Sequence, residues 1–200
     1  MNEATTTLTR AGGVIADAAF RQFAVLPLAA LGWRDITPVG NFAFDYKLDD
    51  GRGAVTVQVK LQRSERGAPV VRRGERYGLE GAVHLVETQK TRTGTDGKAN
   101  LTRPYRYGEF DVLAVSMQPS TGRWDSYRYT LGRWLLVGRN PAEMATLQPV
   151  AIGINAFWTN DFITAANWFR AADDGKRMTI PAAAAKKVSR RKGRSASRGG

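Results

Sequence analysis

The chain contains no cysteine and only one histidine, His84, among its 200 residues. Without cysteine there can be no disulfide framework, no thiol nucleophile and no cysteine-based zinc site. A single histidine also excludes a two-histidine zinc site within one chain. A serine–histidine–aspartate triad would have to use His84, and no nucleophile-elbow sequence accompanies it. The lack of cysteine fits a reducing compartment and excludes hydrolases that depend on a thiol.

Long apolar runs are missing as well. No stretch approaches the ~20 residues that a helix needs to span a bilayer. The first seven residues lack the basic start and the apolar segment of a signal peptide. We therefore expect a cytoplasmic protein without a membrane segment. The length suffices for one globular domain, which we assign to residues 1–180, followed by a basic, disordered tail over residues 181–200.

Acidic residues are outnumbered by basic ones, 18 against 30, and the net charge is +12. Seven basic residues lie between 186 and 198 with no acid among them, and the remainder of the chain still carries +5. Such a surplus suits a polyanion such as DNA, because counterion release favours binding. The alternative is a charged surface that only keeps the protein soluble.

Two further basic segments contain tyrosines that could stack on sugar or base. The first segment carries Arg63, Arg66, Arg72, Arg73 and Arg76, and the second carries Lys90, Arg92, Lys98, Arg103 and Arg106. The tyrosines are Tyr77, Tyr105 and Tyr107. We expect these segments to follow DNA phosphates.

Hydrophobic periodicity predicts a helix followed by a hairpin. A helical stripe within residues 9–30 is formed by Ile15, Ala19, Phe23, Leu26 and Ala30. Pro27 should kink or split this helix. Residues 41–48 and 54–61 then alternate apolar and polar side chains on either side of a turn cluster at 49–53, which is typical of two antiparallel strands.

The rest of the chain predicts fewer elements. We expect loops over residues 62–80 and 90–106, and a strand over 82–88. Residues 110–117 form a nearly continuous apolar run, which favours a strand buried on both faces, and 124–130 reads as its antiparallel return strand. A last helix should begin near residue 159 or 160.

The alternation also predicts how the hairpin strands pair, because a slip of one residue would invert every side chain. The apolar pairs are Leu48 with Val55, Tyr46 with Val57, Phe44 with Val59, and Phe42 with Leu61. The pairs on the other face are Lys47 with Thr56, Asp45 with Gln58, and Ala43 with Lys60. Asp45, Gln58 and Lys60 should therefore gather on one polar face, with directly opposed Cβ atoms about 5 Å apart.

These three side chains have the chemistry of a phosphodiester hydrolase. The carboxylate of Asp45 and the amide oxygen of Gln58 can both ligate Mg²⁺, and the carbonyl of Val59 could add a third oxygen. A lysine beside the metal, Lys60, could lower the pKa of an attacking water or stabilise the charge that develops on the phosphate. The alternative is an ordinary amphipathic hairpin whose polar side faces solvent.

The stretch from Asp45 to Lys60, with its run Val57-Gln58-Val59-Lys60, resembles the active-site hairpin of the PD-(D/E)xK nuclease superfamily in a QxK variant. The resemblance implies an α/β, restriction-endonuclease-like core with a central mixed β-sheet flanked by helices. It also implies a DNA endonuclease that depends on Mg²⁺ or Mn²⁺, with Asp45 and Gln58 as metal ligands and Lys60 as the catalytic lysine. Family members often carry an acid on the first helix, and Asp17 is the best candidate for it.

The sequence departs from the family pattern at two positions. Phe44 stands where a proline often precedes the aspartate, and Gln58 is neutral where an acid is usual. Since each lost carboxylate weakens the attraction for a divalent cation, three outcomes stay open: weak metal binding, help from Asp17, or loss of catalysis.

Two functions other than a nuclease also stay open. The chain could be a catalytically inactive nucleic-acid-binding protein of the same fold, or a phage structural or assembly protein with a basic tail. Many nucleases of this fold dimerise to cut both strands, so the resemblance allows a homodimer, although no dimer surface can be identified in the sequence.

Overall fold

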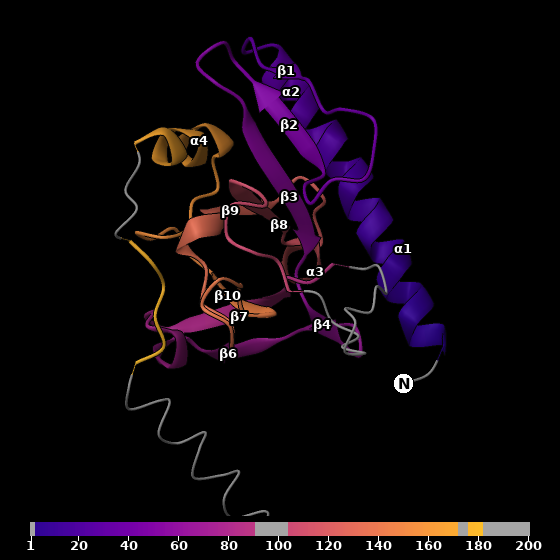
Figure 1. Ribbon diagram of the computed structural model, residues 1–200. Coiled ribbons are helices and arrows are strands. Elements are labelled where there is room, and N and C mark those ends of the chain that lie inside the picture. The colour runs from indigo at the N-terminus through magenta and orange to yellow at the C-terminus, as the bar shows by residue number, and fades with distance from the viewer. Residues whose placement is uncertain (1–2, 91–103, 172–175, 182–200) are drawn as a thin grey trace, which may run out of the picture.

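The computed structural model describes residues 3–90, 104–171 and 176–181, with side chains from residue 12 onward. Three layers follow one another: helices, a five-stranded sheet and a three-stranded sheet (Figure 1). No helix in this described part is both long and apolar enough to cross a membrane.

The helical layer begins with α1 (Glu3–Phe20), which starts earlier than the sequence predicts. It continues through the π-helical turn η1 (Arg21–Val25) into α2 (Leu26–Ala29). The ring of Pro27 would clash with the carbonyl four residues back, at Phe23. The π-helical turn contains Phe23, and the helix runs on to Ala29 instead of splitting.

The apolar stripe predicted for this helix is wrong in its orientation. Its large members are largely exposed, with 49% of Ile15, 48% of Phe23 and 51% of Leu26 in contact with solvent. The buried side chains are Ala16, Ala19, Phe20, Ala24, Val25 and Leu28. Small residues face the sheet because α1 lies close to it: a Cβ at Gly12 would come within 3.2 Å of Leu61 Cδ2.

The central layer is a mixed sheet in the order β1-β2-β3-β8-β9. Its strands are β1 (Arg34–Asp35), β2 (Tyr46–Asp49), β3 (Val55–Leu61), β8 (Val112–Ser116) and β9 (Tyr127–Leu131). β3 and β8 run parallel, and the other neighbours are antiparallel. The predicted mixed α/β core is therefore confirmed, as are the buried strand near residues 110–117 and its return strand.

The third layer was not predicted as a sheet, although its strand β7 confirms the strand expected over residues 82–88. It is an antiparallel sheet in the order β10-β7-β6, made of β6 (Val71–Arg73), β7 (Ala82–Glu87) and β10 (Leu147–Ala151). Residues 62–80, which we expected to be a loop, also contain β4 (Ser64–Glu65), β5 (Ala68–Pro69) and the 3-10 helix η2 (Gly74–Tyr77). The remaining helices are α3 (Gln118–Thr121), η3 (Gly132–Trp134) and α4 (Phe162–Arg170).

The two faces of β3 meet different layers. Val55, Val57 and Val59 pack with the helices, in the same cluster as Phe20 of α1 and Phe162 of α4. On the neighbouring strand β8, Leu113 and Val115 pack with the second sheet. Since successive side chains of a strand alternate between faces, Gln58 and Lys60 of β3 lie on the side of the second sheet. This arrangement places the polar face of the hairpin between two sheets.

Candidate active site

The β2–β3 hairpin has the predicted register over three residue pairs. Tyr46 pairs with Val57, Lys47 with Thr56, and Leu48 with Val55. The other predicted pairs, which involve Phe42, Ala43, Phe44 and Asp45, do not form, because β2 begins only at Tyr46. Asp45 is the residue directly before the paired part of the hairpin begins.

The carboxylate of Asp45 takes the place of the backbone acceptor that the next hydrogen bond between the two strands would use. The backbone N–H of Asp45 still donates to Val57 O at 2.9 Å. The following N–H on β3, that of Val59, donates to Asp45 Oδ2 at 2.8 Å. An aspartate side chain can compete with backbone acceptors in this way. The interaction fixes the carboxylate against the middle of β3.

Gln58 completes the contact between the two strands. Its Nε2 donates to Asp45 Oδ2 and also to the carbonyl of Val59, at 3.2 Å. Only 3% of Gln58 is exposed, so the amide is held inside the protein. The structure thus brings Asp45 and Gln58 together as the sequence predicts, and it places the Val59 carbonyl beside them.

Desolvation by the surrounding protein raises the pKa of the Asp45 carboxyl. The residue as a whole is exposed, but its carboxylate lies against β3, where little water solvates it. The Val59 hydrogen bond and the charge of Lys60 lower this pKa, and the charge of Asp17 raises it. The net direction is upward, so this carboxylate carries an electrostatic cost that a bound cation would relieve.

Asp17 lies on α1, close enough for its charge to act on Asp45. It is exposed, and its backbone carbonyl accepts a hydrogen bond from Tyr46 Oη at 3.1 Å. Among the described residues, no group of three or more histidine, cysteine, aspartate or glutamate side chains could hold a metal ion. A metal here would therefore depend on the amide and the backbone carbonyl as well as on carboxylates.

Lys60 lies on the same face of β3 as Gln58. Burial lowers the pKa of its ammonium group, while the charges of Asp45 and Glu87 raise it. Its Nζ lies 5.4 Å from the centroid of the Tyr105 ring, within the range of a cation–π contact. The lysine thus lies over an aromatic ring and feels the charges of two carboxylates.

The expectation that Tyr105 stacks on sugar or base is wrong. Tyr105 is only 4% exposed, so its ring is not available to stack on sugar or base. It packs instead against Phe110 and the two lysines Lys60 and Lys90. Asp111 belongs to the fold rather than to the site, because its Oδ2 accepts hydrogen bonds from Thr56 N and Oγ1 at 2.8 and 2.7 Å.

The basic segments are described only in part. Arg66, Arg72, Arg73 and Arg76 are exposed, and Arg63 pairs with Glu65 at 3.0 Å. Lys90 and Arg106 are described, whereas Arg92, Lys98 and Arg103 lie outside the described residues, as does the tail beyond Pro181. The exposed arginines remain candidates for phosphate contacts.

Two acids near the site were missed. Glu87, at the end of β7, acts on Lys60, and Glu109 forms an ion pair with Lys90. Both contacts join segments that are far apart in the sequence, and neither acid stands in a motif. Packing of the second sheet against the first brings Glu87 to the site, and the pairing of Gln89 with Pro104 brings Lys90 to Glu109.

Comparisons with known proteins add little to this geometry. No protein-family model matches the sequence, and no curated protein matches it. Among solved structures, a bacterial homing endonuclease, I-Ssp6803I, is similar over 62% of this chain and 68% of its own, with 22% sequence identity and a TM-score of 0.40. A similarity at this level carries no argument about activity.

Proposed function

We propose that this chain is a metal-dependent DNA endonuclease that hydrolyses phosphodiester bonds. The observation that supports it is the convergence of two oxygen atoms, Asp45 Oδ2 and Val59 O, on the amide nitrogen of Gln58. Beside them stands Lys60, a desolvated lysine. An amphipathic hairpin with a solvent-facing polar side would have neither a buried Gln58 nor a desolvated lysine.

The donor set fits Mg²⁺ or Mn²⁺. Carboxylate, amide and carbonyl oxygens are the hard ligands that these ions take. The amide nitrogen of Gln58 donates to Asp45 Oδ2 and to Val59 O. It therefore occupies the position from which a cation would attract these two oxygens. If the amide turned over, its oxygen would join Asp45 and Val59 as a third ligand. Asp17 is near enough to contribute charge.

A bound divalent ion supplies Lewis-acid activation at such a site. The chain's own residues do the rest. Val59 N–H holds the Asp45 carboxylate in place. Lys60 provides a positive charge to phosphate oxygens, whose negative charge grows as a water oxygen bonds to phosphorus. The water gives up a proton to solvent, the bond from phosphorus to the sugar oxygen breaks with its electron pair going to that oxygen, and the oxygen takes up a proton from solvent.

DNA is the proposed partner because the chain carries a net charge of +12 and exposes several arginines beyond the active strand. Phosphate contacts by such residues bind without reading sequence. The choice of DNA follows from the resemblance of Asp45 to Lys60 to nuclease hairpins, since charge alone would equally suit RNA.

A plasmid-nicking assay tests this proposal. Purified protein is incubated with supercoiled plasmid in Mg²⁺ or Mn²⁺, with EDTA as the metal-free control. We expect nicking that requires the metal and is lost in Lys60→Met, which keeps the side-chain length without the charge. Arg34→Gln, an exposed residue paired with Asp49 at the other end of the hairpin, should nick like wild type. Nicking at the wild-type rate in Lys60→Met would refute the assignment.

A second candidate, a nucleic-acid-binding protein without catalysis, is favoured by one observation. Gln58 is neutral and donates its amide N–H to Asp45, so an uncharged donor already occupies the position where a cation would meet the carboxylate. Binding of DNA without cleavage in either metal would support this alternative.

We further propose a homodimer on duplex DNA, because a single cluster cuts one strand at a time. Sedimentation with and without a duplex in Ca²⁺ tests this, and a single copy bound per duplex would contradict it.

A further inference from the structure

Lys90 lies at the same aromatic ring as the proposed catalytic lysine. Its Nζ is 5.5 Å from the centroid of the Tyr105 ring, and the corresponding distance for Lys60 is 5.4 Å. Tyr105 is buried and packs edge-on against Phe110, so the ring is a fixed platform. Because both Nζ atoms lie within the ~6 Å cation–π range of the same ring centre, the two Nζ atoms are no more than about 11 Å apart.

The surroundings of Lys90 fix its position. Its ammonium group forms an ion pair with Glu109, whose other carboxylate oxygen accepts the backbone N–H of Arg106 at 2.8 Å. A β-bridge between Gln89 and Pro104 holds the two segments that carry Lys90 and Tyr105 together. The lysine is therefore positioned by the fold.

Lys90 is nevertheless accessible. Its side chain is 31% exposed and that of Glu109 is 24% exposed. An ion pair in contact with water contributes little net stability and exchanges readily for another anion. The pair Lys90–Glu109 can thus open when a stronger anion arrives.

We propose that Lys90 is a second phosphate-binding residue of the active site. It takes a backbone phosphate next to the one that Lys60 contacts, and it exchanges Glu109 for that phosphate. The ligand class is the phosphodiester backbone of a DNA strand. This inference rests on the proposed nuclease function, and it adds a binding contact to the chemistry assigned to Lys60.

The exchange predicts opposite effects for the two partners. Lys90→Gln removes a phosphate contact, so the affinity for DNA falls several-fold and the slope of log K against log salt becomes shallower by about 0.9. Glu109→Gln removes the competing carboxylate but keeps an acceptor for Arg106 N–H, so the affinity rises. A purely structural ion pair would make both variants less stable and leave the salt dependence of binding unchanged.

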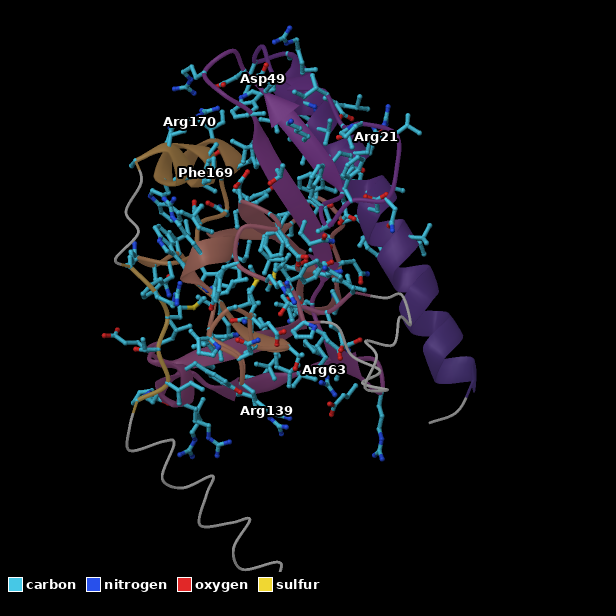
Figure 2. The ribbon with its side chains drawn as sticks, viewed as in Figure 1. Arg21, Asp49, Arg63, Arg139, Phe169 and Arg170 are labelled. Carbon is cyan, nitrogen blue, oxygen red and sulfur yellow. The ribbon has the colours of Figure 1, made fainter. Side chains whose placement is uncertain are left out.

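The control residue is Arg34, which forms an exposed ion pair with Asp49 at 2.7 Å. Asp49 lies at the upper end of the hairpin and Arg63, just beyond Lys60, near the lower part of the molecule (Figure 2). Along β3, Val55 lies about 16 Å from Lys60, at 3.3 Å per residue. Asp49 stands across the hairpin turn from Val55, so the Arg34–Asp49 pair is far from the proposed site. Arg34→Gln should therefore change neither the affinity nor the slope.

The experiment is fluorescence anisotropy with a short labelled DNA duplex in Ca²⁺, repeated at several salt concentrations, with circular dichroism to check folding. Weaker binding with a shallower slope in Lys90→Gln and tighter binding in Glu109→Gln are the expected results. If wild type binds DNA and both variants match it, the inference about Lys90 is wrong while the nuclease proposal stands. If wild type does not bind DNA at all, the proposed function itself fails. Should Lys90→Gln not fold, the direction of the change in Glu109→Gln decides alone.

Discussion

The Asp45 carboxylate accepts the backbone N–H of Val59 at 2.8 Å, in the place where the β2–β3 ladder would otherwise continue. The side chain thereby sets where strand β2 begins and at the same time becomes part of a cluster with Gln58. Because this carboxylate is desolvated, its pKa is raised. The same contact thus shapes the start of the strand and holds in place the carboxylate that we propose as a cation ligand.

Replacing Asp45 by asparagine should separate stability from function. The raised pKa of Asp45 means that the folded state binds more protons than the unfolded state over the interval between the two pKa values, so stability falls as pH rises through it. Above that interval the cost is fully present. Asp45→Asn should therefore be more stable than wild type at pH 8 and lose this advantage as pH falls toward 4, while it loses metal-dependent nicking.

Thermal unfolding at a series of pH values measures the first effect, and plasmid nicking the second. A constant stability difference from pH 8 to pH 4 would show that the charge of Asp45 carries no such cost.

Gln58→Glu should make stability dependent on Mg²⁺. A second carboxylate beside Asp45, without the amide donor, brings two like charges into a buried place, so the melting temperature should fall in EDTA. Mg²⁺ at about 100 times its Kd should then add about 2.7 kcal/mol to the free energy of unfolding. Differential scanning fluorimetry with and without Mg²⁺ provides the measurement.

Gln62→Glu is the matched control for that variant. Gln62 directly follows β3 and is 1% exposed, and among the described residues its side-chain amide has no hydrogen-bond partner. It should be destabilised by the buried charge but gain nothing from Mg²⁺. Equal rescue of both variants would mean that Mg²⁺ acts elsewhere.

The pH profile of nicking should report the ionisation of Lys60. Burial lowers the pKa of this lysine, so the activity that needs its positive charge should fade at a lower pH than it would for an exposed lysine. Lys60→Arg keeps a charge throughout this range and should lose the alkaline decline, at a reduced rate. Lys60→Met should lower the rate by about 100-fold or more at every pH. An unchanged alkaline decline in Lys60→Arg would assign it to another group.

The orientation of the first helix can be tested by two phenylalanines of that helix. Phe20 is fully buried, with its ring 5.2 Å from that of Tyr46 and 5.3 Å from that of Tyr127, whereas Phe23 is 48% exposed. Phe20→Ala should cost about 3–5 kcal/mol of unfolding free energy, and Phe23→Ala no more than about 0.5 kcal/mol. Chemical denaturation measures both losses of unfolding free energy. A larger loss for Phe23→Ala than for Phe20→Ala would mean that the helix faces the sheet with the stripe that periodicity predicts.

Local patterns predicted the centre of the hairpin correctly and failed at its edges. Alternation set Tyr46 opposite Val57, which the structure confirms. The same alternation continued back to Phe42, where no ladder forms, because a pattern of apolar residues does not reveal that the Asp45 side chain takes the Val59 N–H. The helix stripe failed for a related reason, since small residues such as Ala16 were needed for close packing on β3.

Long-range packing explains what could not be predicted. The sheet of β6, β7 and β10 packs against the face of the first sheet that carries Leu113 and Val115, and Gln58, on the same face, is only 3% exposed. Only this second sheet brings Glu87 toward Lys60. The candidate residues could be found from their spacing, but their burial, which gives them unusual ionisation, depends on strands that carry no motif.

The most direct test is a crystal structure with Mn²⁺, in which anomalous scattering locates the ion. The account predicts a peak about 2.1 Å from an Asp45 carboxylate oxygen, the Val59 carbonyl and the Gln58 amide oxygen, with the amide of Gln58 turned over. Mn²⁺ bound only elsewhere, with the Gln58 nitrogen still donating to Asp45, would contradict the proposed metal site.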